Sequence, residues 1–429
     1  MESDYTKITL DNGLTVMLKE IHTAPLASVW MWYKVGSRHE TAGITGVSHW
    51  VEHMQFKGTP QYPNGVLDKA ISRLGGYWNA MTYLDWTTYL ATMPADKIDL
   101  ILSLEADRMV NSLFAEEEVA SERTVIISER QGNENNPGFL LAEMVQAAAF
   151  RVHSYHHQVI GDLADLETMG RDNLYDHYRR YYQPGNAVLA VAGAFETDKL
   201  LDRIQELYAP IPAGELPEFN ARKEPARRGE HTVTLEGPGD TTFIEVAYPA
   251  PAGSAEDFYG FLVLDSLLCG PSSLNIFGGG VSNKTSRLYQ ALVEKDIAVS
   301  VYGGLQATKD PYLYQVVITV HPASTPEKAM AGFDQQIAAL QANLPSEEEL
   351  ERAVKQARAL FAYGSESITN QAFWLGFAEM FDSYSWFLTY LDQLAAVTPE
   401  DIVRIANKYL NTNSRVVGVY RPDGSEELT

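Results

Sequence analysis

The stretch His49-Trp50-Val51-Glu52-His53 carries two histidines four residues apart with a glutamate between them. On a helix, residues four apart lie one turn apart on the same face, and Glu52 projects from nearly that side. Two neutral imidazoles placed in this way can supply two of the three protein ligands of a catalytic zinc, which leaves a fourth position for water. Glu52 is then placed to accept a proton from that water. The order H-x-x-E-H inverts the H-E-x-x-H motif of zinc peptidases.

The residues around this motif predict a helix. Thr41 can cap its start, and Gly58, which precedes Thr59-Pro60, can end it. The apolar residues between these limits are numerous enough to bury one side of the helix: Ile44, Val47, Trp50, Val51, Met54 and Phe56. The motif by itself also fits two ordinary helix histidines beside a surface glutamate, so the metal interpretation needs a third ligand from elsewhere in the chain.

A candidate third ligand lies in the acidic segment 116–130. Glu122 and Glu129 are seven residues apart, which is two helical turns, so they share one face of a predicted helix. One could bind the metal while the other forms a hydrogen bond to a metal-binding side chain and so orients it. Taken alone, the segment fits a solvated acidic helix better than a metal site.

Residues 49–60, H-W-V-E-H-M-Q-F-K-G-T-P, resemble the signature of the pitrilysin-type inverted zinc peptidases, which include insulin-degrading enzyme and mitochondrial processing peptidase. The resemblance implies a zinc endopeptidase with one zinc ion per chain. It implies that His49, His53 and Glu129 bind the metal, because the family's third ligand is a glutamate about this far beyond the motif. Glu52 would be the general base, and Glu122 a second catalytic glutamate that supports the ligand shell.

The resemblance extends along nearly the whole chain. Residues 10–14 are similar to the family's first strand and turn, and residues 182–187 to the close of its first domain. Residues 75–89 resemble the family's substrate-side edge strand. This match assigns substrate binding to Asn79, Ala80, Met81 and Thr82.

The residues of this segment are consistent with that role. Residues 77–83 alternate and are rich in strand formers, so they predict a strand. An extended peptide can add to such an edge through main-chain hydrogen bonds, without a demand for one side-chain sequence. An ordinary hairpin strand facing the core would explain Trp78 and Tyr83 equally well.

The length of 429 residues is too great for one ordinary core and predicts two domains. Segments starting at residues 170 and 398, an offset of 228, each predict a helix, a polar break and a strand. The proline-rich, charged segment 211–229 has the composition of a linker. We therefore expect an α+β fold of two homologous mixed α/β domains, an N-terminal zinc-binding domain at 1–210 and a C-terminal domain at 230–429.

Composition excludes several classes of partner. The net charge is 33 − 56 = −23, which argues against binding to nucleic acid or to anionic membranes. Cys269 is the only cysteine, so no intrachain disulfide can form, and a buried structural thiol is expected. No apolar run approaches the length of a membrane span, so we expect no membrane insertion. No export signal is visible, but the resemblance to small bacterial members implies the periplasm, with the cytoplasm as the alternative.

The predicted C-terminal domain departs from the family at two positions. Family members carry an arginine and a tyrosine in a stretch like L-R-E-K-G-L-A-Y-S-V, where these residues bind substrate and stabilise the oxyanion. Residues 292–301 here are L-V-E-K-D-I-A-V-S-V, with Val293 and Val299 at the two positions. Valine offers neither a donor nor a charge. Tyr302 is near, but a separation of three residues along a strand predicts that it faces away from Val299.

The departure implies a split site, in which a homologous partner subunit of the same fold supplies the arginine and the tyrosine. Paired subunits would enclose peptides or unfolded segments as substrates. The glycine-rich segment 278–283 would contact substrate or partner, although a plain flexible loop explains it as well. Two alternatives stay open: a self-sufficient homodimeric peptidase in which another residue replaces the tyrosine, and a non-catalytic core or assembly subunit. For His153, His156 and His157 we expect a structural turn in preference to a second metal site.

Overall fold

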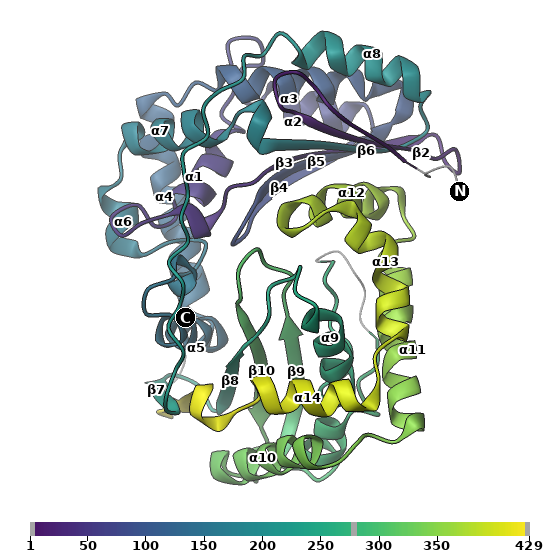
Figure 1. The fold of residues 1–429 in the computed structure, drawn as a ribbon. Helices are drawn as coiled ribbons and strands as arrows, with labels where there is room; N and C mark the ends of the chain where they lie inside the picture. Colours follow the sequence, from purple (N-terminus) through teal and green to yellow (C-terminus); the bar gives the residue numbers. More distant parts are fainter. Residues whose placement is uncertain (1–4, 276–280, 425–429) are drawn as a thin grey trace. The chain divides into compact units, whose positions relative to one another are not determined.

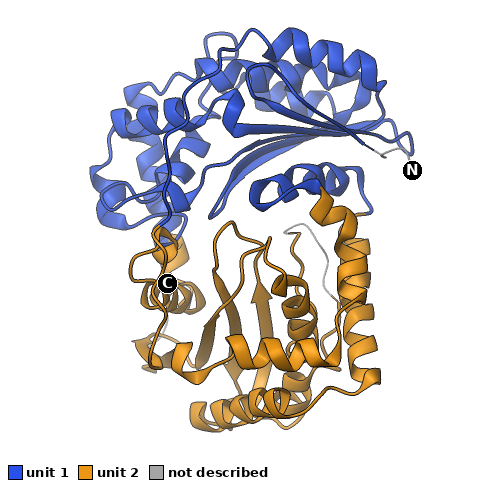
Figure 2. Ribbon diagram, in the orientation of Figure 1, with its two compact units in different colours: residues 1–131, 157–221, 366–384 blue, residues 132–156, 222–365, 385–429 orange. Residues whose placement is uncertain are grey.

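The chain forms two compact units, each built from several separate segments of the sequence (Figure 2). Unit 1 comprises residues 1–131, 157–221 and 366–384, and unit 2 comprises residues 132–156, 222–365 and 385–429. The computed structural model describes residues 5–275 and 281–424. Gly278, Gly279 and Gly280 of the glycine-rich segment lie outside these ranges.

Unit 1 contains a six-stranded sheet with the strand order β1-β2-β6-β3-β5-β4 (Figure 1). Its strands are β1 Thr6–Thr9, β2 Thr15–Glu20, β3 Leu26–Tyr33, β4 Tyr77–Thr82, β5 Thr87–Pro94 and β6 Ala187–Gly193. Only β2 and β6 pair in parallel, and the other neighbours are antiparallel. The predicted first strand and turn are the β1–β2 hairpin, where Gly13 takes a φ of +91°. A residue with a Cβ adopts that conformation only at a steric cost.

The helices of unit 1 include one from the C-terminal half of the sequence. They are α1 Val47–Met54, α2 Val66–Arg73, α3 Asp99–Asn111, α4 Glu116–Glu134, α6 Leu163–Thr168, α7 Arg171–Tyr181, α8 Thr197–Tyr208 and α12 Ile368–Phe381. The late helix, α12, packs on β2, β3 and β6. A Cβ added at Gly376 of α12 would lie 2.1 Å from Nε1 of Trp32, so only glycine allows this approach to the sheet.

Unit 2 contains a five-stranded sheet with the order β7-β11-β8-β10-β9. Its strands are β7 His231–Gly237, β8 Phe243–Pro249, β9 Ala298–Leu305, β10 Leu313–Val320 and β11 Val416–Pro422. Its helices are α5 Pro137–Ala149, α9 Asp257–Leu268, α10 Pro326–Ala342, α11 Glu347–Tyr363, α13 Tyr384–Ala395 and α14 Pro399–Tyr409. Short turns of helix complete the chain: η1 Ser37–His39, η2 Ala95–Lys97, η3 Ser154–His156, η4 Pro184–Asn186, η5 Tyr289–Val293 and η6 Thr412–Ser414. Cys269, which follows α9, is buried.

Apart from β1, which has no counterpart in unit 2, the two sheets share one topology. In unit 1, β6 lies parallel to β2 and antiparallel to β3; in unit 2, β11 lies parallel to β7 and antiparallel to β8. The repeat seen in the sequence corresponds to α7 followed by β6 and α14 followed by β11. The α+β fold of two homologous mixed domains is therefore confirmed.

Each half of the sequence contributes one helix to the sheet of the other half. α5 precedes residue 157 but packs on β7, β8 and β11 of unit 2, whereas α12 belongs to unit 1. The compact units are therefore discontinuous in sequence, while the domains proposed at 1–210 and 230–429 are continuous. Residues 212–228, within the proposed linker at 211–229, contain no helix or strand.

Candidate metal centre

The first two predicted ligands lie on one face of α1. Nε2 of His49 and Nε2 of His53 are 3.2 Å apart, because residues four apart stack along a helix. Burial, followed by the neighbouring His53, lowers the pKa of His49 to about 3. His49 is therefore neutral at physiological pH, which is the form that binds a metal ion.

The third predicted ligand approaches from α4. Oε2 of Glu129 lies 3.9 Å from Nε2 of His49 and 3.8 Å from Nε2 of His53. All three ligand atoms lie within 4.8 Å of one another. Tetrahedral zinc with bonds of about 2.0 Å holds its ligand atoms about 3.3 Å apart, so the three side chains fit zinc with only a small inward movement of the half-exposed Glu129.

Glu122 contacts the ring of His53 and is not one of the three candidate ligands. Nδ1 of His53 donates to Oε1 of Glu122 at 2.8 Å, which leaves Nε2 free to face His49. Lys57 forms an ion pair with the other carboxylate oxygen. Burial raises the pKa of Glu122, but the bonds to His53 and Lys57 outweigh it and lower the pKa overall. An ionised carboxylate here fixes the orientation and tautomer of the histidine.

Glu52 is buried beside the ligands and held by a strand residue. Oγ1 of Thr82 donates to Oε2 of Glu52 at 2.6 Å. Burial raises the pKa of Glu52 to about 7, against the opposing effects of Thr82 and His53. A carboxyl group with a pKa near neutrality can both accept and return a proton, as a general base requires.

The four predicted substrate-binding residues lie on β4, an edge strand of the sheet in unit 1. Asn79 is exposed, Met81 and Thr82 are half-buried, and only Ala80 is buried. β4 also forms a hairpin with β5, and its burial alternates along the strand. The free edge can accept an extended peptide, and the side chain of Thr82 connects the strand to Glu52.

Two family models together match most of the chain. Residues 15–163 match insulinase (peptidase family M16), and residues 168–357 match the peptidase M16 inactive domain. A zinc protease of Mycobacterium tuberculosis, described as uncharacterized, is 30% identical over 75% of this chain and 70% of its own. The chain belongs to peptidase family M16.

Longer matches agree with this M16 membership. An uncharacterized zinc protease of Rickettsia felis is 27% identical over 97% of this chain and 98% of its own. A protease from Helicobacter pylori has a solved structure that matches with a TM-score of 0.90 and 25% identity, over 97% of this chain and 99% of that one. The resemblance inferred from the sequence is therefore confirmed at the level of family and fold. None of the helices in the described ranges has the length and hydropathy that a bilayer crossing requires.

The M16 motif helix has a different start from the one expected. Thr41 is not its cap: α1 begins at Val47, after Gly46, whose φ is +85°. The helix ends at Met54, and the chain turns at Gly58, whose φ is +98°. The amides that open α1 are bound by a carboxylate that precedes the helix, so Thr41 does not cap them.

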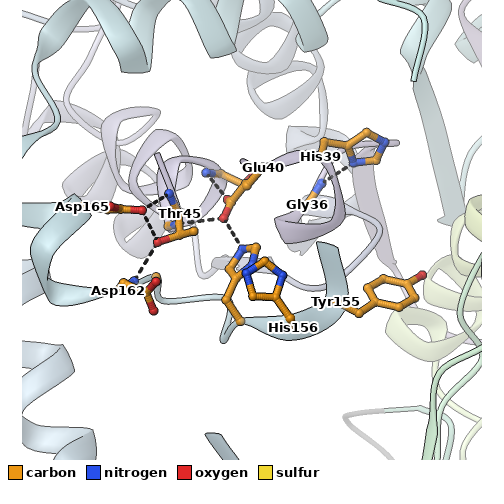
Figure 3. A network of polar contacts seen from close by, with 12 residues as sticks. Gly36, His39, Glu40, Thr45, Tyr155, His156, Asp162 and Asp165 are labelled. Atoms are coloured by element: carbon orange, nitrogen blue, oxygen red, sulfur yellow. Dashed lines mark hydrogen bonds and ion pairs between the residues drawn. The ribbon is translucent and has the colours of Figure 1, made fainter. Parts of the chain in front are cut away.

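That carboxylate is Glu40, a residue that the sequence analysis missed (Figure 3). Its oxygens accept hydrogen bonds from the backbone amides of Gly46 at 2.7 Å and Ser48 at 2.8 Å. Nε2 of His157 lies 2.8 Å from Glu40, whose side chain is fully buried. The negative charge therefore sits at the amino end of the M16 motif helix, where the helix dipole favours it. An acidic residue seven positions before the first residue of the helix was the only signal available in the sequence.

A second carboxylate holds the loop before α1. Oδ2 of Asp165 accepts hydrogen bonds from the backbone amides of Gly43 and Thr45 and from Oγ1 of Thr45 (Figure 3). The Thr45 hydroxyl in turn accepts from the amide of Asp162. The position of His49 and His53 thus depends on contacts with residues more than 100 positions later in the chain.

Replacing Glu40 with glutamine is expected to lower the free energy of unfolding of the metal-free protein by roughly 3 kcal/mol. The glutamine amide would turn an N–H group toward backbone N–H donors in a buried site. Denaturant unfolding in the presence of a chelator measures the loss. The exposed Glu167→Gln is the matched control, with an expected change within about 0.5 kcal/mol. Equal stabilities of the two variants would show that Glu40 does not hold α1.

The three histidines near residue 155 make separate contacts. Nε2 of His153 lies 3.2 Å from Oδ2 of Asp310, and Nδ1 of His156 lies 3.2 Å from the carbonyl oxygen of His153. His157 contacts Glu40. Contacts of this kind are consistent with a structural role for the three histidines.

The two valines of the C-terminal half lie on η5 and β9. Val293 ends η5, and Val299 is exposed on β9, the edge strand of its sheet. The register against β10 shifts at Val299, since Ala298 and Ser300 pair with consecutive residues of β10. This bulge interrupts the strand alternation, and Tyr302 is exposed together with Val299. The expectation that Tyr302 faces away from Val299 assumed a regular strand, and the bulge removes that assumption.

Proposed function

We propose that this M16 chain is the zinc-bearing subunit of an endopeptidase. The observation that carries the proposal is the convergence of Nε2 of His49, Nε2 of His53 and Oε2 of Glu129 beside a buried Glu52. Zinc, when bound there, supplies a Lewis acid that polarises the scissile carbonyl and acidifies water.

The remaining chemistry belongs to side chains of the protein. Glu52 accepts the proton of the attacking water and later delivers it to the leaving amine. Thr82 orients Glu52 through its hydroxyl group. Glu122 orients His53 and keeps the correct ring nitrogen toward the metal.

Substrate would bind as an additional strand at the free edge of β4, along Asn79, Ala80, Met81 and Thr82. Main-chain hydrogen bonds there would hold the scissile carbonyl without demanding a particular side-chain sequence. Peptides and unfolded segments meet this requirement, because their main chains are available for pairing.

A homologous partner subunit of the same fold would supply the arginine and the tyrosine that this chain lacks. Val293 and Val299 support this part of the proposal, because neither can stabilise an oxyanion. One observation favours the self-sufficient alternative: Tyr302 is exposed close to Val299 on the same strand. The non-catalytic alternative has less support, since all five residues of the zinc site are present.

A periplasmic location, with the cytoplasm as alternative, remains an expectation from the family resemblance. Fractionation of cells that express the full gene product would test it.

Metal analysis tests the zinc site directly. We expect close to one zinc ion per chain in the purified protein, and loss of most of it in His49→Ala and His53→Ala, because two remaining ligands bind zinc far more weakly. His22→Ala is the matched control, since His22 is exposed and its ring lies against the carboxylate of Glu20, away from the three proposed ligands. A protein that binds no zinc, or histidine variants that retain it as well as the His22 variant, would contradict the proposed site.

A further inference from the structure

Unit 2 contains a pocket of about 690 Å³ that no part of the zinc site uses. It lies at one end of the sheet, where β7, β10 and β11 begin and β8 ends. The segment 224–228 and residues 149–151 complete its walls. This volume falls within the range of sites that bind small organic molecules.

Three arginines line this pocket, which we call the arginine pocket: Arg151, Arg227 and Arg228. Glu224 is the one acidic residue among its lining residues. The pocket thus has a net positive lining in a chain whose net charge is −23. Such a local reversal of sign concentrates anions against the general charge of the protein.

The carboxylate of Glu224 accepts hydrogen bonds from the backbone. Its Oε2 accepts hydrogen bonds from the amides of Arg151, Val152 and His153 at 3.0, 2.9 and 3.1 Å. Burial raises the pKa of Glu224, but these three amides outweigh it and lower the pKa overall. Glu224 therefore remains an anion that fixes the loop, and its charge also attracts Arg151 and Arg227.

The three arginines differ in their contacts. Nη2 of Arg227 donates to the carbonyl oxygens of Ala148 and Ala149 at 2.5 and 3.0 Å, at the end of α5. Burial lowers the pKa of Arg227 against the nearby charge of Glu224, which raises it, and the like charge of Arg151 lowers it further. Within residues 5–275 and 281–424, the guanidinium groups of Arg151 and Arg228 have neither a hydrogen bond nor an ion pair. A bound anion would relieve the repulsion between Arg151 and Arg227.

Part of the lining of the arginine pocket is apolar. The rings of Phe150 and Tyr312 stack at 5.6 Å with an interplanar angle of 14°, and both side chains are otherwise buried. Pro249, Leu313 and Val416 extend this apolar surface. A ligand that satisfies both parts of the lining carries an acidic head and an apolar body.

We propose that the arginine pocket binds a small organic anion, with its acid group between Arg151 and Arg228 and its apolar part against Phe150 and Tyr312. Guanidinium groups recognise carboxylate and phosphate alike, so the head group is defined as an acid of either kind. The proposal does not depend on the peptidase function, because every residue of the pocket lies outside the zinc site.

Calorimetric titration of the full chain tests the proposal with three probes: 3-phenylpropionate, phenyl phosphate and the neutral 3-phenylpropanamide. We expect at least one acid to bind and the amide to bind about tenfold more weakly, because the amide cannot pair with the arginines. The affinity of the acid is expected to fall as salt is raised. The tighter of the two acids identifies the head group.

Two double variants test whether the acid binds in the arginine pocket. Arg151→Gln combined with Arg228→Gln is expected to weaken the acid about tenfold, whereas Arg222→Gln combined with Lys223→Gln, in the same basic segment but outside the lining, is expected to leave it unchanged. Thermal unfolding and zinc content verify that both variants are folded. Equal binding of acid and amide, no binding of either acid, or equal losses in both double variants would overturn the proposal.

Discussion

Replacing Glu52 with glutamine is expected to reduce peptide hydrolysis by about a thousandfold while zinc remains bound. Glutamine is nearly isosteric and can still accept the hydrogen bond from Thr82, but it cannot accept a proton from water. Hydrolysis of a fluorogenic peptide library, measured beside metal content, gives both quantities for each protein. Because the chain on its own is expected to be slow, the assay must detect the slow rate of the unaltered protein.

Glu117→Gln is the matched control, since Glu117 is an exposed glutamate at the start of α4. It should retain full activity and full zinc content. If Glu52→Gln retains the activity of the unaltered chain with zinc bound, Glu52 is not the general base. If it loses zinc as well, the comparison must be repeated at saturating zinc before the rate is interpreted.

The second large effect concerns the two valines. Zinc-loaded chain alone is expected to turn peptides over slowly, and Val293→Arg combined with Val299→Tyr is expected to raise the rate about a hundredfold, since one missing oxyanion donor costs that much in other hydrolases. Both side chains have room, because Val299 is exposed and Val293 is only half-buried. The rate of peptide hydrolysis at fixed zinc content measures the gain.

The matched control is Val293→Lys combined with Val299→Phe, which restores a charge and a ring but neither the forked guanidinium nor the hydroxyl group. A gain in the first double variant without a gain in the second assigns the effect to those donors. Fast, chelator-sensitive turnover by the unaltered chain would instead show that it completes its own site. In that case loss of activity in Tyr302→Phe would identify the replacement residue.

The features that the sequence predicted well have short-range causes. The spacing of His49 and His53 gives a shared helix face wherever the segment is helical, and the seven-residue spacing of Glu122 and Glu129 does the same on α4. The alternation of residues 77–83 gave β4, although not its neighbours in the sheet. The repeat at an offset of 228 residues predicted two related domains because the same helix and strand recur in each sheet.

Only the tertiary structure showed which residues fix the position of α1, how the helices pack on the sheets and where the strand pairing is irregular. Glu40 binds the opening amides of α1 and meets His157, which lies 117 residues later, so no local capping pattern contains this contact. The exchange of α5 and α12 between the two sheets follows from packing that sequence spacing does not encode. The bulge at Val299 depends on the partner strand, because an extra residue is defined only by the register between two strands. The sequence by itself therefore determined the family and the candidate metal ligands, through motifs and periodicities of a few residues, whereas the supports of the candidate site arose from contacts across long separations.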